Sequence, residues 1–155
     1  SNNAPNSWSV ASYDPQLGLI YLPMGNQSPD QFGGNRSPEV EKFSSSITAL
    51  DANTGKVAWV YQTVHHDLWD MDVPAQPSLL DLTVNGESVP ALVAPTKQGE
   101  VYVLNRRTGQ PILPVTEQPA PTGAVKDDTT APPQPVSPCR RRSQWRRSAR
   151  KRARS

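Results

Sequence analysis

The residues whose types could do chemistry are concentrated between positions 64 and 77. This stretch, VHHDLWDMDVPAQP, contains both histidines of the chain, three carboxylates and a tryptophan: His65, His66, Asp67, Trp69, Asp70 and Asp72. Such a cluster could be a metal site, an acid–base site or a hydrogen-bonded turn. Adjacent histidines point to different sides of an extended chain and no cysteine is nearby, which argues against zinc. An aspartate beside a bulky tryptophan can have its proton affinity adjusted for general-base catalysis, so an acid–base site is favoured.

The sequence around this cluster predicts short β-strands joined by turns. The 17 prolines and 9 glycines leave little room for long helices, and no segment keeps a helical apolar period for three turns. Strands are expected at residues 8–14 and 19–22, and a long polar loop is expected over 26–42. Three hairpins with glycine-containing turns should follow, over residues 45–63, 77–96 and 99–115.

An internal repeat indicates how these hairpins are arranged. The stretch ITALDANTGKVAWVY aligns with VYVLNRRTGQPILPV at a spacing of 54 residues, so that Gly55 matches Gly109. A repeat of this length with several strands inside it is typical of a propeller blade. The alternative is two unrelated hairpins that share a Thr-Gly turn. In the propeller interpretation, Trp59 offers a flat face for packing between blades.

The net charge of +2 combines an acidic body with a basic tail. Nine Lys/Arg residues and no acidic residue lie between positions 140 and 154, whereas residues 1–138 hold seven Lys/Arg and fourteen Asp/Glu. The length of 155 residues fits one ordinary domain. The single cysteine, Cys139, excludes an internal disulfide, and we expect neither a signal peptide nor a membrane-spanning segment, which would need about 20 apolar residues.

Five stretches of the sequence resemble a known family. ALDANTGKVAW resembles the tryptophan-docking motif that recurs around the eight-bladed propeller of pyrroloquinoline quinone (PQQ) dehydrogenases. The others are SWSVASYD, LIYLPMGNQSPDQFGGNRSPE, VYQTVHHDLWDMDVPAQP and APTKQGEVYVLNRRTGQPILPV. Together they resemble the membrane-bound quinoprotein glucose dehydrogenases of Gram-negative bacteria, from about Trp8 to about Ser137. The resemblance implies an all-β fold, with about two to three propeller blades over residues 1–137 and a separate Arg-rich tail over 138–155.

The same resemblance assigns roles to individual residues. Asp70, the second aspartate of HDLWD, matches the base that takes the substrate hydroxyl proton. Trp8 matches the tryptophan beneath the flat quinone ring, and Lys97 in APTKQG matches the basic residue that hydrogen-bonds the reactive quinone oxygens. Asn26 in MGNQ matches a ligand of the divalent ion, and Ser28 lies near that metal. An amide oxygen suits a hard cation such as Ca²⁺.

The resemblance also implies a reaction. PQQ with Ca²⁺ or Mg²⁺ would accept hydride from glucose or another aldose, the product would leave as a lactone, and ubiquinone would receive the electrons. The expected place is the periplasmic face of the bacterial inner membrane. His65, His66 and Asp67 would be local scaffolding. The acidic metal ligands expected upstream of Trp8 and the downstream wall of the pocket are missing from these residues, so the isolated chain is expected to be inactive.

Two other interpretations stay open. One is another PQQ-dependent alcohol or polyol dehydrogenase on the same propeller. The other is a non-enzymatic β-rich module whose basic tail binds nucleic acid by neutralising phosphates. We expect no nucleic-acid partner, because the resemblance and the composition both change abruptly after Ser137.

The tail over residues 138–155 is interpreted as a reading-frame artefact. Its Arg, Ser and Ala residues are typical of GC-rich codons read out of register. The alternative is a genuine basic arm, which would be disordered because it has almost no apolar residues to bury. Translating the same nucleotides in the other two forward frames distinguishes the two. An artefact predicts that one frame resumes strand-and-turn sequence with further Thr-Gly hairpins.

Overall fold

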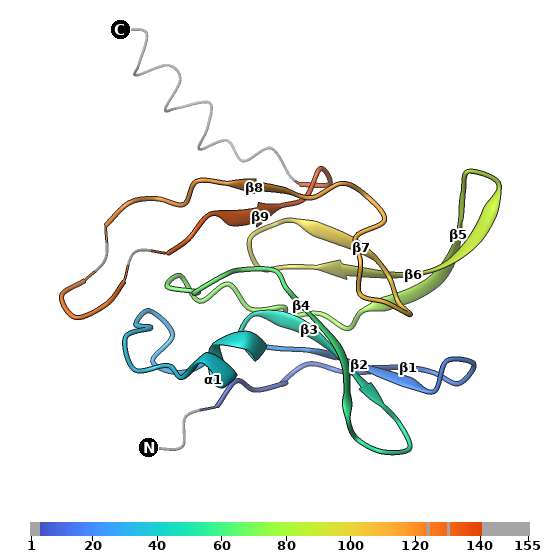
Figure 1. Cartoon of the computed structure of the whole chain (residues 1–155), viewed down its shortest axis with the longest axis horizontal. Coiled ribbons are helices and arrows are strands. Elements are labelled where there is room, and N and C mark those ends of the chain that lie inside the picture. Colours follow the sequence, from blue (N-terminus) through green and yellow to red (C-terminus); the bar gives the residue numbers. More distant parts are fainter. Residues whose placement is uncertain (1–3, 124, 130, 141–155) are drawn as a thin grey trace, which may run out of the picture.

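The fold is built almost entirely from short antiparallel strands (Figure 1). The structure is a computed structural model that describes residues 4–123, 125–129 and 131–140. Its elements are β1 Ser12–Asp14, β2 Leu19–Pro23, α1 Pro38–Phe43, β3 Ser46–Asp51, β4 Val57–Gln62, β5 Ser78–Val84, β6 Glu87–Pro95, β7 Val101–Asn105, β8 Thr116–Gln118 and β9 Gln134–Val136. They form a four-stranded sheet in the order β1-β2-β3-β4, a three-stranded sheet in the order β5-β6-β7, and a β8-β9 ribbon. The all-β prediction is confirmed.

Two of the three predicted hairpins are confirmed. Strands β3 and β4 pair around the Asp51–Lys56 turn, in which the Asp51 side chain accepts hydrogen bonds from the Asn53 and Thr54 amides. Strands β5 and β6 pair in register up to Val84 and Glu87, which leaves Asn85 and Gly86 as a two-residue turn. Both turn residues have positive φ, 53° and 86°, as the favoured tight hairpin turn requires.

The third predicted hairpin is wrong in its second arm. After β7 the chain makes a single bridge between Leu104 and Pro111 and then leaves the sheet. Two backbone hydrogen bonds join the arms here, from the Asn105 amide to the Gln110 carbonyl and from the Ile112 amide to the Val103 carbonyl. Pro111 and Pro114 lack the N–H groups that a ladder needs, which explains the departure. The chain instead continues to β8, which pairs with β9, and neither of these three-residue strands was predicted.

Two boundaries nearer the N-terminus also differ from the prediction. The expected strand over residues 8–14 is regular only in β1, because Trp8 and Val10 are 61% and 64% exposed and pair with no neighbouring strand. The expected loop over 26–42 contains α1. Ser37 caps this helix by accepting a hydrogen bond from the Val40 amide, and Pro38 occupies a first-turn position, where its missing N–H costs nothing.

The core lies between the first two sheets and holds them together. Its fully buried side chains come from both, among them Tyr21, Ile47, Leu92, Tyr102 and Leu104. The Tyr102 hydroxyl also donates to the Pro135 carbonyl at 2.9 Å, which attaches the β8-β9 ribbon to β7. Figure 1 accordingly shows the second sheet between the first sheet and the ribbon.

Trp59 packs between the two sheets, as the repeat predicts. Its indole N–H donates to the Arg106 carbonyl at 3.2 Å, and its ring covers Gly109 in the turn after β7. The Tyr21 ring also lies against the Trp59 ring, with centroids 5.7 Å apart. Arg106 adds a buried ion pair between the sheets, since its Nε lies 2.6 Å from Asp14 Oδ2. Strand-and-turn units joined through a docked tryptophan are the arrangement expected of neighbouring blades.

Gly109→Ala is expected to destabilise the chain more than Gly55→Ala, although the two glycines are equivalent in the repeat. Both have positive φ, +75° and +69°, where alanine costs roughly 1–2 kcal/mol. A Cβ at Gly109 would also lie 2.6 Å from the Trp59 ring, whereas nothing lies within 4 Å of one at Gly55. Overpacking adds about 1–3 kcal/mol, so Gly109→Ala should lose about 2–5 kcal/mol in urea unfolding. Equal losses in the two variants would contradict the packing of Trp59 on Gly109.

The C-terminal boundary predicted after Ser137 stays a prediction. In the described chain, the Val101 amide donates to the Cys139 carbonyl at 2.7 Å, and Glu100 forms a bridge with Arg140. Residues 141–155, which hold most of the Arg-rich tail, lie outside the described residues. Among the described residues, no helix has the length and apolar character needed to cross a membrane.

Candidate functional site

The loop after β4 is shaped by Asp67. This fully buried carboxylate accepts hydrogen bonds from the backbone amides of Trp69 and Met71, at 2.8 and 2.7 Å, and from the Ser45 hydroxyl at 2.5 Å. A carboxylate that satisfies several donors within one loop fixes the path of the backbone. These contacts support the scaffolding role predicted for Asp67. Because they hold the amides on either side of Asp70, they also fix the position of the Asp70 backbone.

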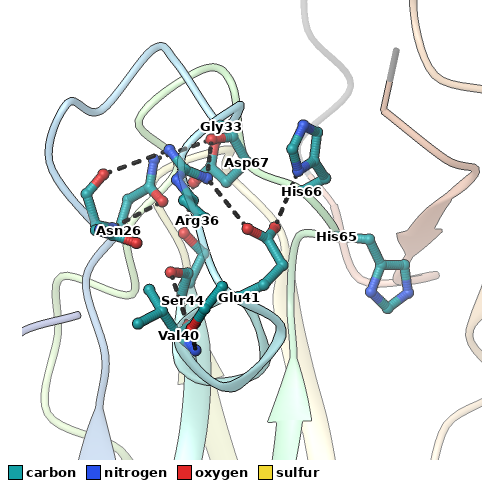
Figure 2. A network of polar contacts seen from close by, with 12 residues as sticks. Asn26, Gly33, Arg36, Val40, Glu41, Ser44, His65, His66 and Asp67 are labelled. Carbon is teal, nitrogen blue, oxygen red and sulfur yellow. Dashed lines mark hydrogen bonds and ion pairs between the residues drawn. The ribbon is translucent and has the colours of Figure 1, made fainter. Parts of the chain in front are cut away.

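A buried arginine joins this loop to the loop that follows β2. The Arg36 side chain is 2% exposed and donates to the Asp67 carbonyl at 2.8 Å. Its other terminal nitrogen donates to the carbonyls of Gln27, Pro29 and Asp30 at 3.2–3.4 Å. Figure 2 shows this guanidinium at the centre of the network. The arginine therefore fixes the two loops relative to each other.

Asn26 belongs to the same network and is almost completely buried. Its side-chain amide donates to the carbonyls of Asp30 and Asp67, at 2.7 and 3.1 Å, and its Oδ1 accepts from the Gln27 amide at 2.9 Å. Ser28, predicted to lie near a metal, is exposed two residues later in this loop. The network fixes the Asn26 side chain in one orientation. An amide oxygen has two lone pairs, so Oδ1 can accept a further partner besides the Gln27 amide.

The two histidines have different partners and do not share a site. The His66 ring lies between two carboxylates, with Nδ1 3.3 Å from Glu41 and Nε2 3.1 Å from Asp128. The His65 ring points elsewhere, with Nε2 3.5 Å from Glu117 (Figure 2). Within the described residues, no group of three or more His, Cys, Asp and Glu side chains is placed to hold a metal ion.

Asp128 links the His66 side of this loop to a distant segment. Its carboxylate accepts the Gly33 amide at 2.7 Å and lies 3.1 Å from His66 Nε2. Burial opposes its ionisation, but the Gly33 and Thr129 amides and the His66 ring together hold the pKa of Asp128 below its ordinary value. These contacts support scaffolding roles for the histidines, with His66 fastening the loop to residues 127–129.

Asp70 and Lys97, two predicted site residues of opposite charge, form a direct ion pair. Lys97 Nζ lies 2.5 Å from Asp70 Oδ2 and 3.3 Å from Asp72 Oδ2. Lys97 is carried by the turn between β6 and β7, and Asp70 projects from a residue with φ of 59°, a conformation that costs a non-glycine residue energy. The hydrogen bond to Asp70, with that to Asp72, raises the pKa of Lys97. Burial raises the pKa of Asp72, against its hydrogen bonds from Asn26 and Lys97.

Asp72 connects this ion pair to the remaining predicted residues. Its Oδ1 accepts the Asn26 amide at 2.7 Å. A Cβ placed on Gly25 would lie 3.1 Å from both Asp72 Oδ1 and Trp8 Nε1. The Trp8 indole and the Asp72 carboxylate therefore both lie beside Gly25. The structure thus brings Trp8, Asn26, Asp70 and Lys97 into one neighbourhood, although they come from four segments of the chain.

Sequence reasoning gave no role to Asp72 or to Arg36. Asp70 and Asp72 are two positions apart, a spacing that places side chains on one side of an extended chain and so could have suggested a shared partner for Asp72. Arg36 carries no comparable signal. Its importance comes from backbone carbonyls of two loops, which meet only in the folded chain.

The residues of this neighbourhood fit PQQ better than they fit a complete metal site. Trp8 is 61% exposed and the Lys97 side chain is 43% exposed, and an accessible indole and ammonium suit a flat ring system with anionic substituents. For a divalent cation, Asn26 Oδ1 is one suitable oxygen. Asp70 and Asp72 are both paired with Lys97, whereas Ca²⁺ takes about 6–8 oxygen ligands.

The fold and this site together define a class of protein. Residues 1–153 match the profile of the PQQ family described as glucose/ethanol/alcohol dehydrogenase, beta-propeller domain, and the chain belongs to this family. It is similar to the quinoprotein glucose dehydrogenase of Escherichia coli, at 59% identity over 135 residues, and to that of Gluconobacter oxydans, at 59% over 136 residues. Each alignment covers 87% of this chain and 17% of the relative, so the chain spans about a sixth of their length.

Solved structures support the same fold. The quinohemoprotein alcohol dehydrogenase of Comamonas testosteroni matches 87% of this chain with a TM-score of 0.64 and 28% identity, over 20% of its own length. A europium-containing methanol dehydrogenase matches 87% of this chain with a TM-score of 0.63 and 33% identity, over 23% of its length. The propeller prediction and the family resemblance are therefore confirmed.

Proposed function

We propose that this chain supplies the PQQ-binding and proton-accepting part of a quinoprotein dehydrogenase that oxidises glucose or another aldose to a lactone. The observation that carries the proposal is the contact between Asp70 and Lys97 at 2.5 Å, beside the exposed indole of Trp8. A base, a cation and a flat aromatic surface are the three protein groups that this reaction needs. The 59% identity to two quinoprotein glucose dehydrogenases supports an aldose as the substrate.

The residues of the chain would divide the work as follows. Trp8 holds the ring system by stacking and excludes water from that face. Asp70, whose side chain is 34% exposed, accepts the proton of the substrate hydroxyl at its free oxygen. Lys97 supplies positive charge where negative charge develops, in a position fixed before the reaction begins. PQQ, when bound, supplies the electron-accepting chemistry that no side chain can provide.

A divalent cation belongs to the same proposal. Asn26 would contribute its Oδ1 to Ca²⁺ or Mg²⁺, and Ser28 would lie near the ion. The network from Arg36 supports this role because it orients the Asn26 amide before any ion binds. The other oxygen ligands would come from parts of the protein that correspond to the rest of the relatives. We further propose ubiquinone as the electron acceptor and the periplasmic face of the inner membrane as the location.

The experiment that tests the proposal uses a complete enzyme. In the grafted enzyme, residues 1–137 of this chain replace the matching segment of the Escherichia coli relative. Trp8→Ala should weaken PQQ binding at least about tenfold, because stacked area and its geometry are both lost. Equilibrium dialysis with absorbance detection gives the Kd. Tyr13→Ala is the matched control, since Tyr13 lies five positions further along the chain in β1 and is 56% exposed, against 61% for Trp8, and should leave the Kd within twofold.

The parent grafted enzyme also tests the substrate. PQQ-dependent oxidation of glucose with a dye acceptor supports the proposal, and its absence from a correctly folded, PQQ-loaded graft contradicts it. A polyol is the second candidate, because the glycerol dehydrogenase large subunit of Gluconobacter oxydans is 49% identical over 139 residues. Comparing kcat/KM for glucose and glycerol in the same preparation separates the two.

A further inference from the structure

Asp72 makes contacts that no role has so far explained. It is 8% exposed and joins three segments of the chain. Its Oδ1 accepts the Asn26 amide at 2.7 Å, its Oδ2 accepts from Lys97 Nζ at 3.3 Å, and its backbone carbonyl accepts the Lys97 amide at 3.2 Å. Asp72 therefore holds Lys97 by both its backbone and its side chain.

The two carboxylates beside Lys97 differ in how firmly they are held. The Asp72 side chain is 11% exposed and anchored by the Asn26 amide, whereas the Asp70 side chain is 34% exposed. One ammonium group thus lies between a fixed carboxylate and a more accessible one. If Asp70 were the only anion present, a proton gained by Asp70 would leave the ammonium without a charged partner. With Asp72 in place, Lys97 keeps a counter-charge throughout.

We infer that Asp72 is a positioning residue, which holds the Lys97 ammonium in place while Asp70 gains and loses the substrate proton. The inference rests on the proposed function for the roles of Asp70 and Lys97. It requires no contact between Asp72 and the substrate. A fixed second anion also prevents the ammonium from following Asp70 alone, so the lysine remains available to a ligand on the exposed side.

Asparagine at position 72 separates this role from a purely structural one. Its amide oxygen can still accept the Asn26 N–H, so the connection between the two loops is preserved. The negative charge that faces Lys97 is lost. Thermal melting reports whether the fold survives the change. Asp72→Ser, which keeps a hydroxyl oxygen near the Asn26 amide and carries no charge, repeats each measurement should Asp72→Asn melt early.

The first measurement needs neither PQQ nor turnover. The 155-residue chain is pulse-labelled with an amine-acylating reagent, and the labelling of Lys97 is normalised to that of Lys56, an exposed lysine in the β3-β4 turn. Loss of one anionic partner lowers the proton affinity of the amine, so Asp72→Asn should raise the Lys97 rate about threefold or more. An unchanged or slower rate overturns the inference.

The second measurement is a double-mutant cycle in the grafted enzyme. Asp72→Asn should lower kcat about tenfold with the KM for sugar within twofold, and should lower it less than twofold when Lys97→Met is already present. Equal losses in the two backgrounds, or no loss in either, overturn the inference. Failure of the proposed function looks different, because the parent graft would then oxidise no sugar, while the labelling rates would still report on Asp72.

Discussion

Asp70→Asn in the grafted enzyme is expected to lower kcat for glucose oxidation by about 10²–10⁴-fold, the usual contribution of a general base. Asparagine has nearly the same shape and can still accept the Lys97 hydrogen bond, so the loop and its ion-pair partner stay in position. The amide cannot take a proton from the substrate hydroxyl. PQQ affinity, measured by equilibrium dialysis, should therefore change little, while turnover at saturating PQQ and glucose falls.

His65→Asn is the control for this prediction. His65 lies in the same loop, five positions before Asp70, but its ring faces Gln62 and Glu117. Its replacement should lower kcat less than about tenfold, because no proton transfer depends on it. If His65→Asn were the more damaging of the two changes, the assignment of the base to Asp70 would be wrong.

The parts of the fold that could be predicted from sequence are those fixed by local interactions. The β5-β6 hairpin follows from Asn85 and Gly86, two residue types that readily adopt the positive φ of a tight turn. The docking of Trp59 follows from a repeat in which each copy provides the same turn. Residue types indicated an acid–base site between positions 64 and 77. The individual assignments of Trp8, Asn26, Asp70 and Lys97 came from the resemblance, because their four segments meet only after folding.

The parts that sequence could not provide depend on contacts between distant segments. Strands β8 and β9 have three residues each, which is too short for an alternating apolar pattern to be recognised. They also pair across a separation of about sixteen positions, so no local turn signal joins them. Helix α1 spans six residues, fewer than two turns, although Ser37 and Pro38 carry the start signal that was overlooked. Apart from an ion pair with Glu41 at 3.8 Å, the partners of Arg36 in the described chain are backbone carbonyls. Every residue has a carbonyl, so no pattern of side chains reveals these contacts.

Loss of this arginine is also expected to destabilise the chain. Arg36→Met should lower the free energy of unfolding of the chain by about 2–4 kcal/mol, because it removes hydrogen bonds from a charged donor, which contribute about 1.5–3 kcal/mol each. The carbonyls of Asp67 and Gln27 are the partly buried acceptors concerned. Methionine keeps much of the apolar stem, so the loss reports on hydrogen bonds more than on packing.

Arg107→Met is the matched control, since Arg107 is exposed in the turn after β7 and the same change removes the same charge. It should alter the free energy of unfolding by less than about 0.5 kcal/mol, as surface changes usually do. Urea unfolding of both variants gives the comparison. Arg36→Met should also weaken divalent-ion binding by the grafted enzyme, because Asn26 shares the carbonyls of Asp30 and Asp67 with Arg36. A stable Arg36→Met variant with unchanged ion affinity would show that the two loops hold their positions without the arginine.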